Sequence, residues 1–150
     1  MSESEQKLKL SPAEIEAIAS LDLVTKFVFL TVIRFFLHLK NQEDLVYNPG
    51  VAFSIYTFYL HSWRYCSEFK ELCELHLTTG AIFRSLKILS QSQSKLLSGT
   101  LDASKVFGHY HTNLPLQQTE ELLVQHISAI PSEQHKQYVL NLALAQLEKF

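Results

Sequence analysis

An apolar run near the N-terminus, residues 21–39, most constrains how this chain can fold. Thirteen of its nineteen residues are apolar, but Asp22, Lys26, Arg34 and His38 interrupt it. A helix that spans a bilayer needs about 20 predominantly apolar residues with few or no charges. The run therefore predicts no membrane span, but a helix of a soluble fold that is buried over most of its circumference.

Length and composition predict a single all-α domain. The chain has 150 residues, of which 47% are hydrophobic and 19% charged, enough for one continuous core but short for two domains. Four Gly and four Pro are few for an all-β chain, whose tight turns use these residues repeatedly. We expect one compact bundle of five to seven helices over residues 11–150, preceded by a flexible tail over residues 1–10.

Helix-start signals recur along the chain. The strongest is Ser11-Pro12-Ala13-Glu14, which combines a hydroxyl N-cap, a proline at the first helical position and a glutamate that can bond back to the cap N–H. Residues 20–22 can either break this helix or be bridged by it; we expect the break, with Asp22 as a second cap and the next helix from Leu23, and we expect a bend near Ser67. The predicted helices cover residues 12–19, 23–40, 49–79, 81–98, 119–129 and 133–148.

Aromatic residues are concentrated in the first half of the chain, where twelve of the seventeen lie between residues 27 and 69. We expect the helices over 23–40 and 49–79 to pack as an antiparallel, aromatic-rich central hairpin. A domain of this size has difficulty in burying all these rings together with the aliphatic stripes of the other helices. Part of this surface is therefore expected to contact a protein partner or a second copy, as in a homodimer. The residues predicted at that contact are Phe35, Phe36, Tyr56, Tyr59 and Trp63.

Histidine and cysteine residues cluster at one place. His61, Cys66, Cys73 and His76 lie within sixteen residues of one another. On a continuous helix, however, His61 points away from the other three, and four converging ligands would require a break in the helix. We expect no metal site, and we expect the two cysteines to be buried, reduced thiols.

The segment 100–118 is predicted to be a loop with one short helical turn at 102–107. It contains His109-Tyr110-His111, a pattern that could bind a metal or act in acid–base chemistry. No nucleophile or carboxylate pair accompanies these residues, so a surface loop with a packed tyrosine is expected instead. Without a glycine-rich phosphate loop or a catalytic constellation elsewhere, we predict no enzyme activity and no cofactor.

The net charge and the N-terminal residues indicate which partners and which cellular location to expect. A net charge of −2 supplies no positive field for phosphate backbones, which disfavours nucleic acid as a partner. The polar start MSESEQKLKL lacks the order of a secretory signal, which indicates a cytosolic or nuclear protein, and of these we expect a cytoplasmic one.

Leu10-Ser11-Pro12-Ala13-Glu14 resembles the opening of the first helix in many globins, and an all-helical chain of this length is similar to a globin in size. The resemblance implies an axial histidine, for which His76, His109 or His111 could serve, although none lies in a matching sequence pattern. Our leading hypothesis is a non-enzymatic helical protein–protein interaction module, such as an adaptor, an assembly factor or a small complex subunit. A globin-like sensor that binds haem or a small molecule between the central helices is the alternative.

Overall fold

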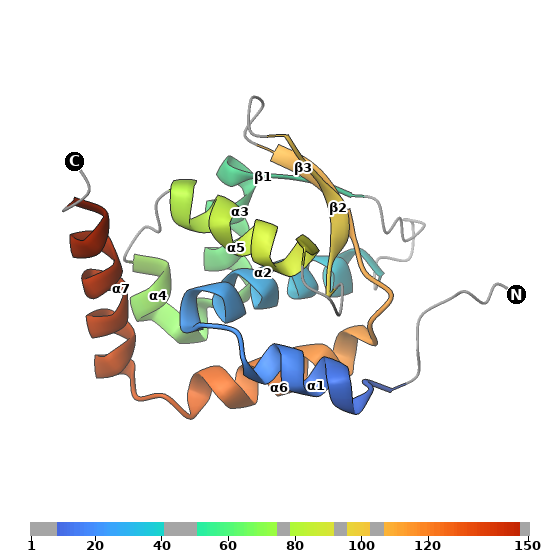
Figure 1. The fold of residues 1–150 in the computed structure, drawn as a ribbon, viewed down its shortest axis with the longest axis horizontal. Helices are drawn as coiled ribbons and strands as arrows, with labels where there is room; N and C mark the ends of the chain where they lie inside the picture. Colours follow the sequence, from blue (N-terminus) through green and yellow to red (C-terminus); the bar gives the residue numbers. More distant parts are fainter. Residues whose placement is uncertain (1–8, 41–50, 75–78, 92–95, 103–106, 148–150) are drawn as a thin grey trace, which may run out of the picture.

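The fold is seen in a computed structural model, which describes residues 9–40, 51–74, 79–91, 96–102 and 107–147 (Figure 1). In chain order, the elements are α1 (Pro12–Ala19), α2 (Leu23–Lys40), β1 (Val51–Ser54), α3 (Ile55–Tyr65), the 3-10 helix η1 (Ser67–Phe69), α4 (Lys70–Glu74), α5 (Thr79–Gln91), β2 (Ser98–Asp102), β3 (Phe107–His111), α6 (Leu116–Ser128) and α7 (Ser132–Leu147).

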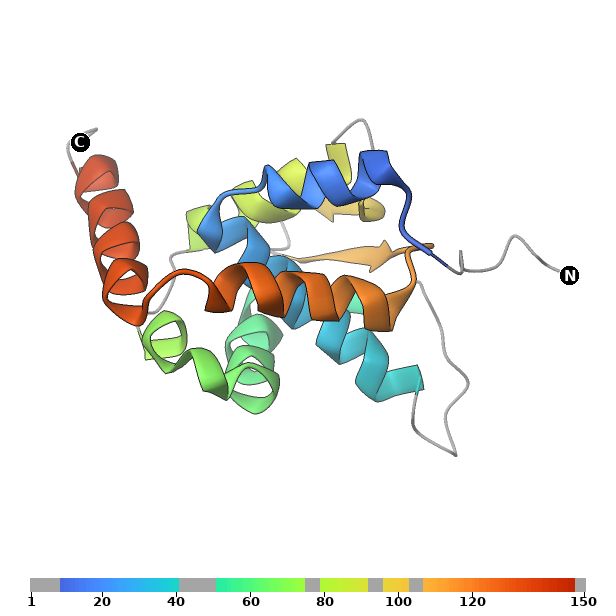
Figure 2. The same cartoon turned by 90° about the horizontal axis from the view of Figure 1, so that it is seen from below.

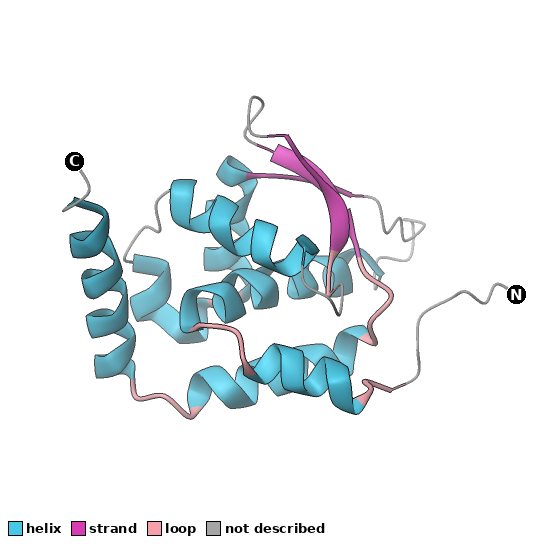
Figure 3. Cartoon of the chain, viewed as in Figure 1, coloured by secondary structure: helices cyan, strands magenta, loops and turns pink. Residues whose placement is uncertain are grey.

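The prediction of a mainly helical chain is confirmed, but the structure adds a small antiparallel sheet at one side of the helices (Figure 3). Strand β3 lies between β1 and β2. Its Tyr110 is paired with Val51 of β1 and with Gly99 of β2. From the sequence, β1 was predicted to be the start of a helix, and β2 and β3 a helix end and a loop. These assignments are wrong, because strands this short are stabilised by their pairing more than by their own residue preferences.

The predicted starts of the first two helices are confirmed. The Ser11 hydroxyl accepts a hydrogen bond from Glu14 N at 3.2 Å, and the Glu14 carboxylate accepts one from Ser11 N at 2.9 Å, which completes a capping box. At the start of α2, the Asp22 carboxylate accepts a hydrogen bond from Thr25 N at 2.9 Å. Local side-chain chemistry thus fixes both helix starts.

Leu10 belongs to the folded domain, although the prediction placed it in the tail. Its side chain is buried in the core, and its N–H donates to the Gln118 side chain of α6 at 2.9 Å. The packed part of the chain therefore begins before residue 11.

Helix α2 is the centre of the fold. It lies against α3, α5, α6 and α7, and α6 crosses it in the view of Figure 2. Its contacts with α5 and α6 are more extensive than those with α3, and the predicted α2–α3 hairpin at the centre of the core is not confirmed. Each fully buried Val, Leu, Ile or Phe stabilises the fold by roughly 1.5–3 kcal/mol. The residues of α2 with 0% exposure are Val24, Thr25, Val28, Phe29, Leu30, Thr31, Val32, Ile33 and Phe36.

Polar side chains at the start of α2 also find partners within the chain, as a buried position requires. Asp22 pairs with Arg84 of α5 at 3.1 Å, and Thr25 shares a hydrogen bond with Ser85 of α5 at 3.1 Å. Among the helices that the structure describes, none combines the length and apolar character that crossing a bilayer demands.

Candidate functional site

Helix α3 ends at a break that hydrogen bonds hold in place, close to the bend predicted near Ser67. Cys66 N donates to Ser62 O at 2.9 Å, and Phe69 N donates to Cys66 O at 3.0 Å to open η1. The Cys73 thiol donates to the carbonyls of Ser62 and Cys66, at 3.4 Å each. The thiol is thus a second donor to each of these two carbonyl groups at the end of α3.

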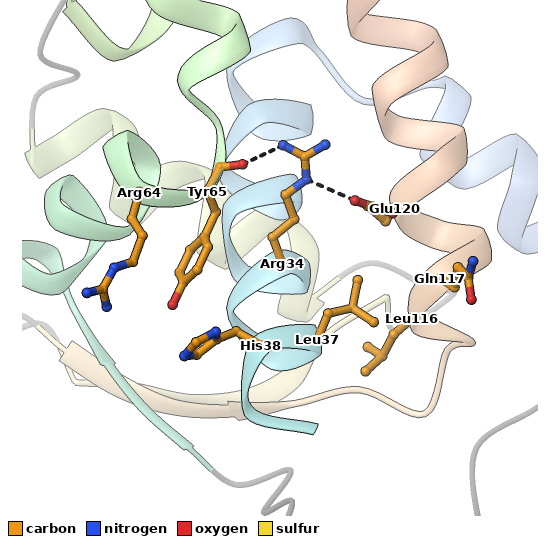
Figure 4. Close-up of a pocket in the computed structure, with 8 residues that line it drawn as sticks. All are labelled: Arg34, Leu37, His38, Arg64, Tyr65, Leu116, Gln117 and Glu120. Carbon is orange, nitrogen blue, oxygen red and sulfur yellow. Dashed lines mark hydrogen bonds and ion pairs between the residues drawn. The ribbon is translucent and has the colours of Figure 1, made fainter. Parts of the chain in front are cut away.

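Arg34 of α2 ties this break to α6. Its Nε donates to Glu120 Oε2 at 3.0 Å, and its Nη1 and Nη2 donate to the two oxygens of Glu68 at 2.7 and 2.9 Å. Nη1 also donates to the carbonyl of Tyr65, the last residue of α3 (Figure 4). One guanidinium therefore holds three segments together through bonds that its planar fork geometry favours.

The charges of this network stabilise one another. Burial disfavours the charge on Arg34, but the hydrogen bonds and attraction from Glu68 and the bond to Glu120 outweigh it, so the guanidinium pKa is raised further. The hydrogen bond from Arg34, opposed in part by burial, lowers the pKa of the Glu68 carboxyl. Arg34 and Glu68 therefore both stay charged around neutral pH.

The Cys66 thiol lies next to this network. Its Sγ is 3.5 Å from Thr31 Oγ1, and burial raises its pKa to about 11. Both Cys66 and Cys73 are buried free thiols, which confirms the prediction. A buried thiol that stays protonated is a poor nucleophile.

An open groove with a volume of about 620 Å³ lies beside the network (Figure 4). Pockets that bind ligands measure about 300–1,000 Å³. The groove combines apolar surface from two leucines with several hydrogen-bonding side chains. It is lined by Arg34, Leu37 and His38 of α2, Arg64 and Tyr65 of α3, and Leu116, Gln117 and Glu120 of α6.

Arg64 differs from Arg34, although both line the groove. Arg64 is exposed, and no carboxylate of the described residues lies within ion-pair distance of it. In Figure 4 the Tyr65 ring lies between the two guanidinium groups. Arg34 is thus used by the fold, while Arg64 can pair with an anion from outside.

Two large apolar side chains precede Arg64 on α3 and face solvent. Leu60 is 61% exposed and Trp63 is 42% exposed. Residues three and four apart on a helix are neighbours, so Leu60, Trp63 and Arg64 share one face of α3. We refer to these three residues as the α3 patch. The buried face of the same helix carries Phe58 and Ser62.

No protein-family model, curated protein or solved structure matches this chain. Its function is therefore inferred from its own side chains. The groove and the α3 patch, which meet at Arg64, are the features from which that inference starts.

The structure separates the aromatic residues that the sequence analysis predicted at a partner contact. Trp63 is exposed, as such a contact requires. Phe36 is 0% exposed, so it packs in the core of its own chain and is no part of the surface. Phe35 is partly buried, and its ring stacks on His61 with the ring centroids 4.2 Å apart.

Other predicted residues fall outside the described part of the chain. Tyr56 and Tyr59 lie on α3, but their side chains are not among those described. The same holds for the side chains of His109 and His111 on β3, and for His76 altogether. Among the residues that are described, no group of three or more His, Cys, Asp or Glu is arranged to hold a metal ion.

Arg34, Leu60 and Arg64 were not predicted from the sequence as site residues. A cation in the middle of an otherwise buried helix must be paired, so the position of Arg34 could have indicated a partly buried ion pair. Its partners could not be read from the sequence, because Glu68 and Glu120 are 34 and 86 residues away. Leu60 and Arg64 carry no signal of their own before the packing of α3 is known.

Proposed function

We propose that this chain is a non-enzymatic protein–protein interaction module, acting as an adaptor, an assembly factor or a small subunit of a complex, and that it contacts its partner through the α3 patch. The observation that supports this proposal is the joint exposure of Leu60 and Trp63 on one face of α3. Tryptophan and arginine are enriched among the residues that dominate binding energy at protein interfaces. The α3 patch places one of each beside an exposed leucine.

The position of α3 adds to the argument. Ile15 on α1 and Leu140 on α7 are also exposed, but they lie on separate helices, whereas Leu60 and Trp63 are neighbours. The C-terminal end of α3 is held by Arg34 through the Tyr65 carbonyl. A surface that is held in place before binding loses less conformational entropy when a partner arrives.

The proposal is tested by photo-cross-linking in the cells from which the protein comes. Benzoylphenylalanine is introduced in place of Leu60, and in a matched variant in place of Lys136, an exposed residue of α7. We expect the variant with the probe at position 60 to form a discrete covalent adduct with a protein, and the control to form none of the same mass. Equal labelling at both positions, or no adduct at position 60, would contradict the proposal.

The globin-like alternative remains a prediction, and the described core does not favour it. Phe27 and Phe58 meet between α2 and α3 in an edge contact, with ring centroids 6.2 Å apart, where a bound group was expected. Titration with haem, followed by the visible absorbance spectrum, tests this alternative directly.

We also propose a cytoplasmic location. Both cysteines are free thiols, and disulfides are rare in the reducing cytosol. Thiol counting on protein purified under non-reducing conditions should find both thiols in the denatured chain.

A further inference from the structure

Arg64 joins the α3 patch to the groove, because it belongs to both. On α3 it directly follows Trp63 and lies one turn after Leu60. In the groove it lies at the end opposite Leu116 and Gln117 (Figure 4). A partner seated on the α3 patch therefore brings its neighbouring side chains to the mouth of the groove.

The carboxylates of this region are already engaged. Both oxygens of Glu68 accept hydrogen bonds from Arg34, and Glu120, the carboxylate that lines the groove, accepts one from the Nε of the same guanidinium. Arg34 cannot accept another anion without giving up these bonds. Counting only partners in the described part of the chain, Arg64 is the groove guanidinium that remains for a carboxylate from outside, and such a charge-assisted pair is roughly twice as strong as a neutral hydrogen bond.

The electrostatic surroundings of a neighbouring residue point the same way. Burial lowers the pKa of His61, and repulsion from Arg64 and from the His38 imidazolium lowers it further. His38 also lines the groove, and its ring centroid lies 5.4 Å from that of Tyr65. The end of the groove next to Arg64 therefore favours negative charge.

We propose that the partner docks with an acidic amphipathic segment, whose apolar side chains cover Leu60 and Trp63 and whose Asp or Glu carboxylate pairs with Arg64 at the mouth of the groove. This inference rests on the proposed function, because it names the chemistry of the partner at the same surface. Charge complementarity at Arg64 distinguishes this occupant from a purely apolar one.

A second copy of this chain is the competing occupant. Two copies that met through their α3 patches around a two-fold axis would bring both Arg64 side chains into one interface. Like charges that are brought together at an interface cost free energy. An acidic segment gains free energy from the same arginine, so the charge of the α3 patch favours a different protein.

The test is a selection from a displayed library of short random peptides against the full chain. Wild type, Arg64→Glu and Lys87→Glu are used in parallel, where Lys87 is an exposed control cation on α5. We expect wild type and Lys87→Glu to enrich peptides in which Asp or Glu lies beside Leu, Phe or Trp. Arg64→Glu should enrich Lys or Arg beside the same apolar residues, and should bind the best wild-type peptide about tenfold or more weakly.

Two outcomes would overturn the inference, and they are distinguishable from failure of the proposed function. If wild type and Arg64→Glu enrich the same apolar peptides, the acidic part is wrong while the α3 patch remains a contact surface. If cross-linking from position 60 joins only copies of this chain, the partner is the chain itself. By contrast, if the selected peptides still bind the double variant Leu60→Ser with Trp63→Ser, the α3 patch is not the contact surface. The proposed function would then be wrong as well.

Discussion

Helices α2 and α3 are both rich in aromatic and aliphatic side chains, yet the chain buries the first and leaves part of the second exposed. Helix α2 has neighbours on several sides, namely α3, α5, α6 and α7. Helix α3 packs through Phe58 and Ser62 and exposes Leu60 and Trp63. Apolar content alone therefore does not identify an interaction surface. The position of a helix in the fold decides which of its apolar side chains remain exposed.

The largest expected effect tests the buried side of this comparison. Phe36→Ala removes a fully buried ring from α2 and leaves a cavity, so it should lower the free energy of unfolding by about 3–5 kcal/mol. Trp63→Ala should lower it by less than about 1 kcal/mol, because that ring is exposed. Urea denaturation followed by circular dichroism measures both. Similar losses for the two variants would mean that the contrast between α2 and α3 does not hold.

The two arginines of the groove provide the next test. Arg34→Met leaves Glu120 and the Tyr65 carbonyl without their donor, and should lower the free energy of unfolding by about 2–3 kcal/mol. Arg64→Met, the matched control, removes an exposed cation without an ion-pair partner among the described residues, and should change it by less than about 0.5 kcal/mol. Equal effects would show that the network of Arg34 does not hold the end of α3.

Titration of Cys66 measures how well the end of α3 is covered. Its thiol pKa is raised from 9.0 to about 11 by burial, so the thiol ionises first in the unfolded chain. The stabilisation is complete below about pH 9 and is lost as the pH rises through about 11. By about pH 10 wild type should have lost roughly 1 kcal/mol that Cys66→Ala does not lose. Parallel pH profiles for the two proteins would indicate that Cys66 is hydrated.

Local signals predicted much of the helical framework. The capping box at Ser11 and the cap at Asp22 act within a few residues, so they can be read from the sequence. The sheet could not be predicted in this way. Val51 of β1 pairs with Tyr110 of β3, far along the chain, and such pairing depends on the packed fold.

The candidate site shows the same limit. Trp63 was predicted, because a cluster of rings exceeds what one domain can cover. Phe36 was predicted for the same reason and is buried, because the sequence did not show how α5 and α6 enclose α2. The sequence likewise does not show that Arg34 is paired while Arg64 is exposed, because Glu120, a partner of Arg34, comes from α6, far along the chain.

A small effect on stability is the most informative about the exposed side of α3. Leu60→Ser combined with Trp63→Ser removes two exposed apolar side chains, so the free energy of unfolding should fall by less than about 1 kcal/mol. Phe58→Ser, on the buried face of the same helix, is the control and should cost about 3 kcal/mol or more. Thermal and urea denaturation of the three proteins measure the difference. A loss near 2 kcal/mol in the double variant would show that the chain itself covers this face, and α3 would then resemble α2. A neutral double variant that no longer forms the cross-linked complex would separate folding from binding, because the two side chains would contribute to the partner contact and not to the fold.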